Sequence, residues 1–250
     1  MPLDPYLTSA KDIQEIVTAR AVGATACMRG LGFRKWPLDL SDPSMPGDDG
    51  ETDVFEYLDP AVAAKEGYPT PSATVTPEIS RHVPTRDELG AFSGKASKTK
   101  AGVAVPPGGC ERQGDLKVFA GQPRLPADPR SLAVDSRSQA MTDSRVRKAI
   151  AGWKECVGGK GLAYDSPVVP AHDLRWVNRT AGTAAGEEEK RVAAIDATCR
   201  NEVNLVGVYK TVRAAYENIL LTKNKAELDA AAPIFAQWLA NARAVIKAGY

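Results

Sequence analysis

The sequence predicts an all-α protein, a disulfide-stapled helical bundle with long irregular loops rich in proline and glycine. Apolar residues recur at the three- and four-residue spacing of helices, most clearly in the second half of the chain. Four widely spaced cysteines are typical of an oxidised framework. Stretches rich in Pro, Gly, Ser and Thr, which favour turns and loops, separate the periodic segments.

The first predicted helix lies near the start of the chain. Thr8 or Ser9 can cap its first turn, because a side-chain oxygen there accepts a free backbone N–H. Apolar residues at helical spacing then run over 13–31, and Gly32 is typical of a helix end.

The next segments are predicted to be mostly irregular. Residues 34–58 combine prolines with an acidic run and indicate a loop. Asp59-Pro60 is a cap followed by proline at the first helical position, so a short helix should run toward Gly67. Residues 68–126 indicate a long irregular stretch with one helical turn over 85–89, a length that usually has a functional reason.

The second half of the chain shows the clearest helical periodicity. A single helix of about 35 residues is predicted to begin at the acidic run Glu187–Glu189, since acidic side chains favour a helix N-terminus. The other predicted helices cover 131–141, a segment capped by Asp143 or Ser144 and ended by Gly158-Gly159, and the residues after Asn224 up to Gly249.

The chain is interpreted as one helical domain, 1–250, with two related halves, 1–126 and 127–250, as an alternative. The alternative rests on a weak internal echo. In each half a cysteine, Cys27 or Cys156, occupies the last helical turn, and a glycine follows five residues later.

The four cysteines predict two disulfides and no metal site. None belongs to a Cys-x-x-Cys pair or lies near a histidine in sequence, so zinc is not expected. Four cysteines allow three pairings. We expect Cys27 with Cys110, and Cys156 with Cys199, because Cys156 ends one helix and Cys199 lies on the next long one.

The composition of the chain excludes some classes of partner. The formal net charge is +1, which gives no field to attract nucleic acid, so no nucleic-acid partner is expected. No apolar run is long enough to span a bilayer. Residues 1–5 lack the features of a signal peptide, so the chain is either cytosolic or has lost its export signal. The cysteines favour the second reading.

Several short motifs occur in an order that covers nearly the whole chain and all four cysteines: Pro2-Leu3-Asp4-Pro5-Tyr6, Ala26-Cys27-Met28-Arg29 to Gly32-Phe33, Asp59-Pro60-Ala61-x-Ala63-Ala64-x-x-Gly67-Tyr68, Pro107-Gly108-Gly109-Cys110, Trp153-x-x-Cys156 and Asp196-Ala197-x-Cys199. Together they resemble a family of exported, often lipid-anchored actinobacterial proteins of the Streptomyces type, with no established activity. The chain departs from that pattern at Val157 and Leu162, both apolar for apolar. The resemblance implies a signal peptide and a lipid anchor upstream of Met1, and it supplies no catalytic residues.

The candidate binding residues are two loop tryptophans and the residues next to one of them. Trp176 follows His172, Asp173 and Arg175 closely, and Trp36 lies in a loop of the first half. A loop tryptophan either covers the core or contacts a partner. His172 with Asp173 also offers a base for an extracellular hydrolase, although no Gly-x-Ser-x-Gly motif is present.

The sequence therefore predicts a non-catalytic binding or interaction protein of the cell envelope, located outside the cytoplasm and needing no cofactor. Its partner is expected to be a peptide, a cell-wall component or another envelope protein. The alternatives are a hydrolase that uses His172 and Asp173, and a structural subunit of an envelope assembly, for which apolar residues exposed on the last helix would be the mark. The acids at 187–189 are interpreted through the helix dipole rather than as a metal site.

Overall fold

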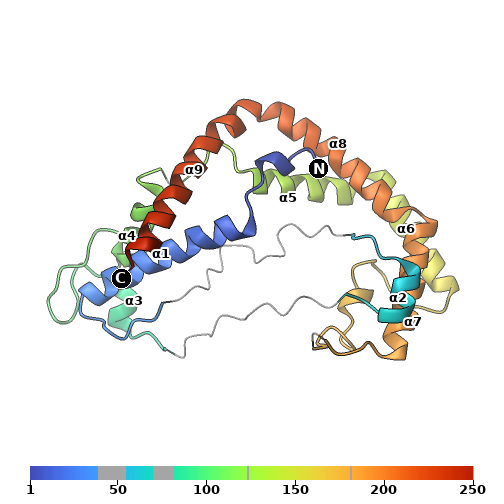
Figure 1. Cartoon of the computed structure of the whole chain (residues 1–250), viewed down its shortest axis with the longest axis horizontal. Coiled ribbons are helices and arrows are strands. Elements are labelled where there is room, and N and C mark those ends of the chain that lie inside the picture. The colour runs from blue at the N-terminus through green and yellow to red at the C-terminus, as the bar shows by residue number, and fades with distance from the viewer. Residues whose placement is uncertain (39–54, 70–81, 123, 181, 250) are drawn as a thin grey trace. The chain divides into compact units, whose positions relative to one another are not determined.

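The computed structural model describes residues 1–38, 55–69, 82–122, 124–180 and 182–249. Within these residues the fold is all α, as predicted, and the β contact found is an isolated bridge between Lys98 and Ala104. The elements in chain order are η1 (Asp4–Tyr6), α1 (Ala10–Gly30), α2 (Pro60–Glu66), α3 (Arg86–Ser93), α4 (Gly109–Phe119), α5 (Pro129–Thr142), α6 (Ser144–Gly159), η3 (Pro170–His172), α7 (Glu187–Glu202), α8 (Leu205–Lys223) and α9 (Lys225–Ala248) (Figure 1).

The chain divides into two compact units, each assembled from three separate segments. Unit 1 comprises Met1–Pro5, Glu51–Val75 and Arg130–Lys223. Unit 2 comprises Tyr6–Gly50, Thr76–Pro129 and Asn224–Tyr250. This division differs from the halves 1–126 and 127–250. The first residues, Met1–Pro5, belong to the same unit as most of the second half, and the last segment, Asn224–Tyr250, belongs to the same unit as most of the first half.

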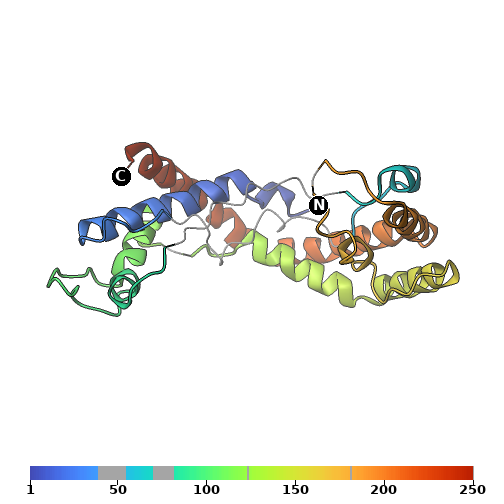
Figure 2. The same cartoon turned by 90° about the horizontal axis from the view of Figure 1, so that it is seen from below.

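The core of unit 1 forms where three of its helices meet. Helix α6 packs against α7 and α8, and the short α2 lies on α7 (Figures 1 and 2). Trp153 and Tyr209 are fully buried there, and the Phe55 ring meets Tyr209 edge-on at 5.2 Å between centroids. This unit carries the connection from α6 to α7, on which four of the predicted site residues lie.

Unit 2 is built on α1, which packs against α4 and α9 (Figures 1 and 2). Gly23 of α1 and Gly114 of α4 let the two backbones approach closely: a Cβ added at Gly114 would lie 2.4 Å from the carbonyl oxygen of Arg20. On the α9 side the Phe119 and Trp238 rings meet at 4.7 Å between centroids.

The predicted caps are confirmed at three helices. The Ser9 hydroxyl accepts the backbone N–H of Asp12 at the start of α1. Asp59 caps α2 ahead of Pro60, and Asp143 caps α6 through the N–H of Arg145. Local capping chemistry, which depends on adjacent residues, explains why these starts are readable from sequence.

Two of the sequence expectations are wrong. The single long helix from Glu187 is two helices, because Asn204 between α7 and α8 has a positive φ of 49°, a conformation that asparagine tolerates better than most residues. The stretch 68–126 is also less irregular than expected. Its described part holds the two-turn α3 and the whole of α4, whose glycine-rich start hides it from a pattern search.

Both predicted disulfides form, each within one unit. Cys27 pairs with Cys110 in unit 2, and Cys156 with Cys199 in unit 1. They indicate an oxidising setting.

The internal echo of the sequence corresponds to a shared helix ending. Gly32 and Gly161 have φ values of 99° and 82°, which a side chain would oppose. The backbone N–H groups of the next residues, Phe33 and Leu162, donate to carbonyls of the preceding helical turn. Each half of the chain thus ends one helix, just beyond its cysteine, with the same turn.

No helix in the described part of the chain is both long and apolar enough to cross a membrane.

Candidate functional site

Four of the five predicted binding residues lie together in unit 1. His172, Asp173, Arg175 and Trp176 belong to the connection between α6 and α7, at and just after η3. Trp36 belongs to unit 2 and is not part of this group.

Trp36 is buried in the core of unit 2. It is 9% exposed, and its ring stacks on Phe92 at 5.2 Å between centroids. The His82 ring meets it edge-on at 5.7 Å. These contacts favour a packing role for Trp36 over contact with a partner.

Trp176 forms the floor of the group in unit 1. It is 8% exposed, its indole N–H donates to the carbonyl of Pro170 at 2.9 Å, and its ring stacks near Tyr68 at 6.2 Å. The guanidinium of Arg175 also lies over the Trp176 ring, 4.5 Å from its centroid. Such cation–π stacking holds an arginine flat against an aromatic surface.

Asp173 fixes the same arginine edge-on. Arg175 donates to the carboxylate through Nε at 3.0 Å and Nη2 at 2.7 Å, and its backbone N–H also donates to it at 3.0 Å. Those bonds from Arg175 hold the pKa of Asp173 well below its usual range. The Tyr164 hydroxyl donates to Asp173 at 2.8 Å and accepts from Arg175 at 2.7 Å. Burial and the bond to Asp173 raise the pKa of Tyr164 to about 12.

The first turn of α7 supplies a second anchor for Arg175. Its Nη1 donates to Glu188 at 3.2 Å, and Arg191, one turn further on, donates to the same carboxylate. Hydrogen bonds from Arg191, with the nearby charge of Arg175, lower the pKa of Glu188. Arg175 is thus oriented by a ring, two carboxylates and a hydroxyl although its side chain is half exposed, at 51%.

Glu189, the next acid of the run, is buried rather than solvated. It is 3% exposed and accepts from Arg179 through Nε at 3.0 Å and Nη2 at 2.8 Å. The backbone N–H of Tyr68 donates to it at 3.2 Å, and Arg179 donates in turn to the carbonyl of Tyr68 at 2.7 Å. The helix dipole therefore explains only part of this acidic run.

A buried carboxylate lies beneath these contacts. Asp196 is fully buried and accepts from the indole N–H of Trp153 at 2.9 Å and the hydroxyl of Tyr68 at 3.0 Å. Arg200 pairs with it through Nε at 2.8 Å and Nη2 at 2.9 Å. Burial and the Asp196 carboxylate raise the pKa of Tyr68 well above its usual value. Tyr68 therefore connects the buried ion pair to Glu189 and Trp176.

A pocket of about 410 Å³ opens between the loop and the start of α7. Its size is at the lower end of the range of small-molecule sites. Leu174 at its edge is 86% exposed. The pocket is lined by Leu174, Arg175, Trp176, Asn178, Arg179, Gly186, Glu188 and Glu189; we call it the α7 pocket.

His172 does not join this arrangement. It is exposed, and its Nδ1–H donates to the carbonyl of Val168 at 2.9 Å. The Asp173 carboxylate bonds to Arg175 and Tyr164 instead. A hydrolase needs a carboxylate that orients its histidine, and the recorded contacts of these two residues do not favour that alternative.

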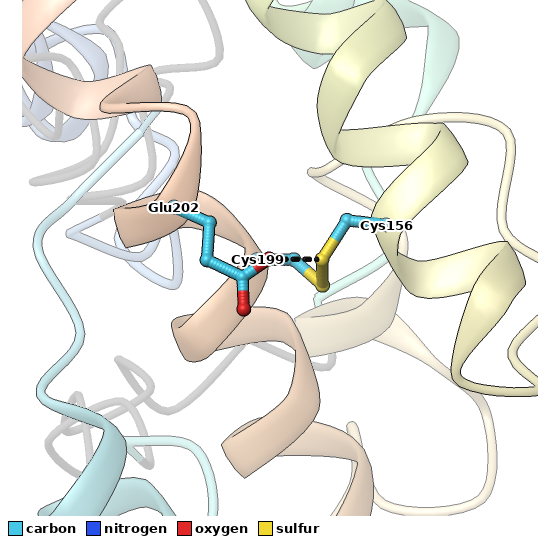
Figure 3. A group of neighbouring side chains, drawn as sticks. All are labelled: Cys156, Cys199 and Glu202. Carbon is cyan, nitrogen blue, oxygen red and sulfur yellow. Dashed lines mark hydrogen bonds between the residues drawn. A yellow bond between two sulfur atoms is a disulfide. The ribbon is translucent and has the colours of Figure 1, made fainter.

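One group of acidic and sulfur side chains in the described residues has metal-like spacing. The ligand atoms of Cys156, Cys199 and Glu202 lie within 4.8 Å of one another (Figure 3). The two sulfurs are bonded to each other, and metals bind the free thiolate, so the intact disulfide does not make a metal site. The Glu202 Oε2 lies 3.1 Å from the Cys156 sulfur, which carries no hydrogen to donate.

The sequence interpretation missed the residues that support the pocket. Tyr68, Arg179, Glu189 and Asp196 come from three separate segments, and nothing local connects them. One signal was present: Asp196 lies on the apolar face predicted for its helix, four residues before Arg200. An acid on a buried face requires a partner, and position i+4 supplies one.

Comparison of the chain with protein-family models, with curated proteins and with solved structures finds no match.

Proposed function

We propose that this protein is a non-catalytic binding protein of the cell envelope and that it holds a peptide segment of a partner protein at the α7 pocket. The observation that carries the proposal is the pairing of the exposed Leu174 with Arg175, which is oriented before any ligand arrives. Arginine and aromatic residues dominate the energetics of protein interfaces, and prior ordering of such a side chain reduces the entropy lost on binding.

The composition of the pocket favours a peptide over a charged small molecule. Its two arginines are already paired with acids, so the site offers neither sign of charge in excess. Leu174, which lines the pocket and is 86% exposed, provides an apolar contact next to these polar groups. This mixture matches the core and rim of a protein interface.

The envelope location rests on the disulfides together with the family resemblance. Two intramolecular disulfides suit an exported protein, since the cytosol keeps most thiols reduced. A lipid anchor on a mature N-terminus upstream of Met1 is part of this proposal. The alternative of a structural subunit draws less support, since the large apolar side chain exposed on α9 within the described residues is Ile246, at 38%.

The test is site-directed photo-crosslinking in cells that export the protein. A photoreactive residue at position 174 should give a discrete adduct, and mass spectrometry should identify a peptide in it. Position 83 is the matched control, because Val83 is 84% exposed but lies in unit 2. Arg175→Ala should weaken the adduct at 174, and Arg175→Lys should not restore it, because lysine lacks the planar fork. Equal adducts at 174 and 83, or none at 174, would exclude the α7 pocket as the binding surface.

A further inference from the structure

The disulfide of unit 1 has an acidic side chain against its accessible sulfur. Cys199 is fully buried, whereas Cys156 at the end of α6 is half-buried. Glu202 lies on the last turn of α7, with Oε2 3.1 Å from the Cys156 sulfur (Figure 3). Lys160 binds the other oxygen of this carboxylate at 3.3 Å.

The accessible sulfur is the point at which an external thiol must act. In thiol–disulfide exchange a thiolate forms a bond to one sulfur, and the electron pair of the broken S–S bond leaves on the other. Because Cys199 is buried, the new bond forms at Cys156 and Cys199 leaves as the thiolate. A second thiolate then attacks the mixed disulfide and releases Cys156. The attacking thiolate brings its negative charge close to Glu202, and the departing Cys199 thiolate develops a negative charge beside the same carboxylate.

We propose that Glu202 protects the Cys156–Cys199 disulfide electrostatically, so that external thiols open the Cys27–Cys110 disulfide first. Glu202 has a carboxylate oxygen within 4.8 Å of both sulfurs of the Cys156–Cys199 pair. Among the described residues, no Asp or Glu side chain lies that close to both sulfurs of the Cys27–Cys110 pair. Residue burial does not distinguish the two bonds, since each joins one fully buried cysteine to one of intermediate burial. The protected bond joins α6 to α7 and so holds the helix that begins at the α7 pocket.

The proposal is tested by following both disulfides in the full chain during reaction with thiols of different charge. Samples are trapped by rapid alkylation, and the four cysteines are quantified by mass spectrometry. In the wild-type protein Cys27–Cys110 should open first. Glu202→Gln should speed the opening of Cys156–Cys199 about fivefold, as expected for lost repulsion between unit charges about 4 Å apart in water.

Charge dependence separates protection by repulsion from protection by packing. Anionic glutathione should show a larger effect of Glu202→Gln than cysteamine, whose ammonium group offsets its thiolate. Lys160→Ala should slow the opening, because it exposes the full charge of Glu202, and added salt should reduce both differences.

Two controls guard the interpretation. Glu155→Gln removes an exposed acid adjacent to Cys156 in sequence and should have little effect. The Cys27–Cys110 rate in the same molecules should stay constant, since a rise in both rates would indicate loosening of the fold. The proposal fails if Glu202→Gln leaves the Cys156–Cys199 rate unchanged, if it speeds both disulfides equally, or if Cys156–Cys199 opens first in the wild-type protein.

Discussion

The two units of this chain differ in the kind of side chain that they bury. Unit 1 buries charged side chains: Asp196 with Arg200, Arg213 with Glu217, and Glu189 with the partly buried Arg179. Unit 2 buries mainly apolar side chains, in two clusters along α1, and lets α1 and α4 meet backbone to backbone at glycines. The α7 pocket belongs to the unit with the buried charges.

This difference has a physical reason. An apolar cluster holds helices together without specifying direction, because the hydrophobic effect is not directional. A buried carboxylate must be satisfied by donors at fixed positions, so it also fixes the loops that carry those donors. Arg200, for example, donates to the carbonyl of Pro167 at 2.6 Å, in the connection that leads to Trp176. Buried charge therefore suits a unit that must hold a long loop in one conformation.

The largest expected effect is at the buried carboxylate of unit 1. Asp196→Asn removes the charge that Arg200 pairs with, and breaking a buried pair on one side costs about 3–5 kcal/mol. Chemical denaturation followed by tryptophan fluorescence measures the loss. Asp165→Asn is the control: its partner Lys154 is 2.6 Å away, but Asp165 is 93% exposed, so no loss is expected.

A double substitution sharpens this result. Replacing the pair with apolar residues, Asp196→Leu with Arg200→Met, should recover only part of the stability. The desolvation cost of both charges disappears, but the Trp153 indole N–H and the Tyr68 hydroxyl lose their buried acceptor. The connection from α6 to α7 should nevertheless become more mobile, which hydrogen exchange around 164–179 would detect. If Asp196→Asn lowered the free energy of unfolding no more than Asp165→Asn does, the buried charge would not support unit 1.

The second effect concerns the close helix crossing of unit 2. Gly114→Ala should destabilise the protein by about 1–3 kcal/mol, because the added methyl meets the Arg20 carbonyl at 2.4 Å and forces the backbones apart. The helix propensity of alanine, about 1 kcal/mol better than glycine, works against this loss. Gly30→Ala is the matched control, since nothing lies within 4 Å of its added Cβ. Equal melting temperatures for the two variants would refute the importance of the crossing.

The same contrast explains what the sequence could reveal. Caps at Ser9, Asp59 and Asp143 depend on neighbours along the chain, and so do the helices they begin. The break at Asn204 was missed because the apolar pattern continues across it, and one backbone angle decides it. Helix α4 was missed because two of its four buried residues, Gly109 and Gly114, are glycines, which add nothing to an apolar pattern.

The loop residues of the candidate site could be predicted from the sequence. The residues that hold this loop in place could not. His172, Asp173, Arg175 and Trp176 lie within five consecutive residues, so composition alone drew attention to them. Tyr68 is 121 residues from Glu189, and that pairing depends on how the helices pack. Charge pairs spread across a chain leave no periodic trace.

The smallest expected effect is a dependence on pH in unit 2, at the start of α3. Burial raises the pKa of Glu88. The backbone N–H and hydroxyl of the N-cap residue Thr85, which both donate to the Glu88 carboxylate, and nearby His82 outweigh burial and lower that pKa below its ordinary 4.5. A carboxyl whose pKa is lower in the folded state stabilises the fold above its unfolded pKa, and this contribution is lost as pH falls through the folded value. The free energy of unfolding should therefore decline as the pH falls below about 4.5, and this decline should be smaller in Glu88→Gln.

Thr85→Ala separates the cap from the charge. It should cost about 1 kcal/mol at neutral pH, because the N–H of Glu88 loses its acceptor. Below pH 4 the same substitution should cost less, since the reciprocal bonds from Thr85 to the carboxylate are already weakened by protonation. Thermal melting of the wild-type, Thr85→Ala and Glu88→Gln proteins from pH 3 to 7 measures both terms. A constant cost of Thr85→Ala across that range would mean that the charge of Glu88 adds nothing to the contribution of the Thr85 hydroxyl.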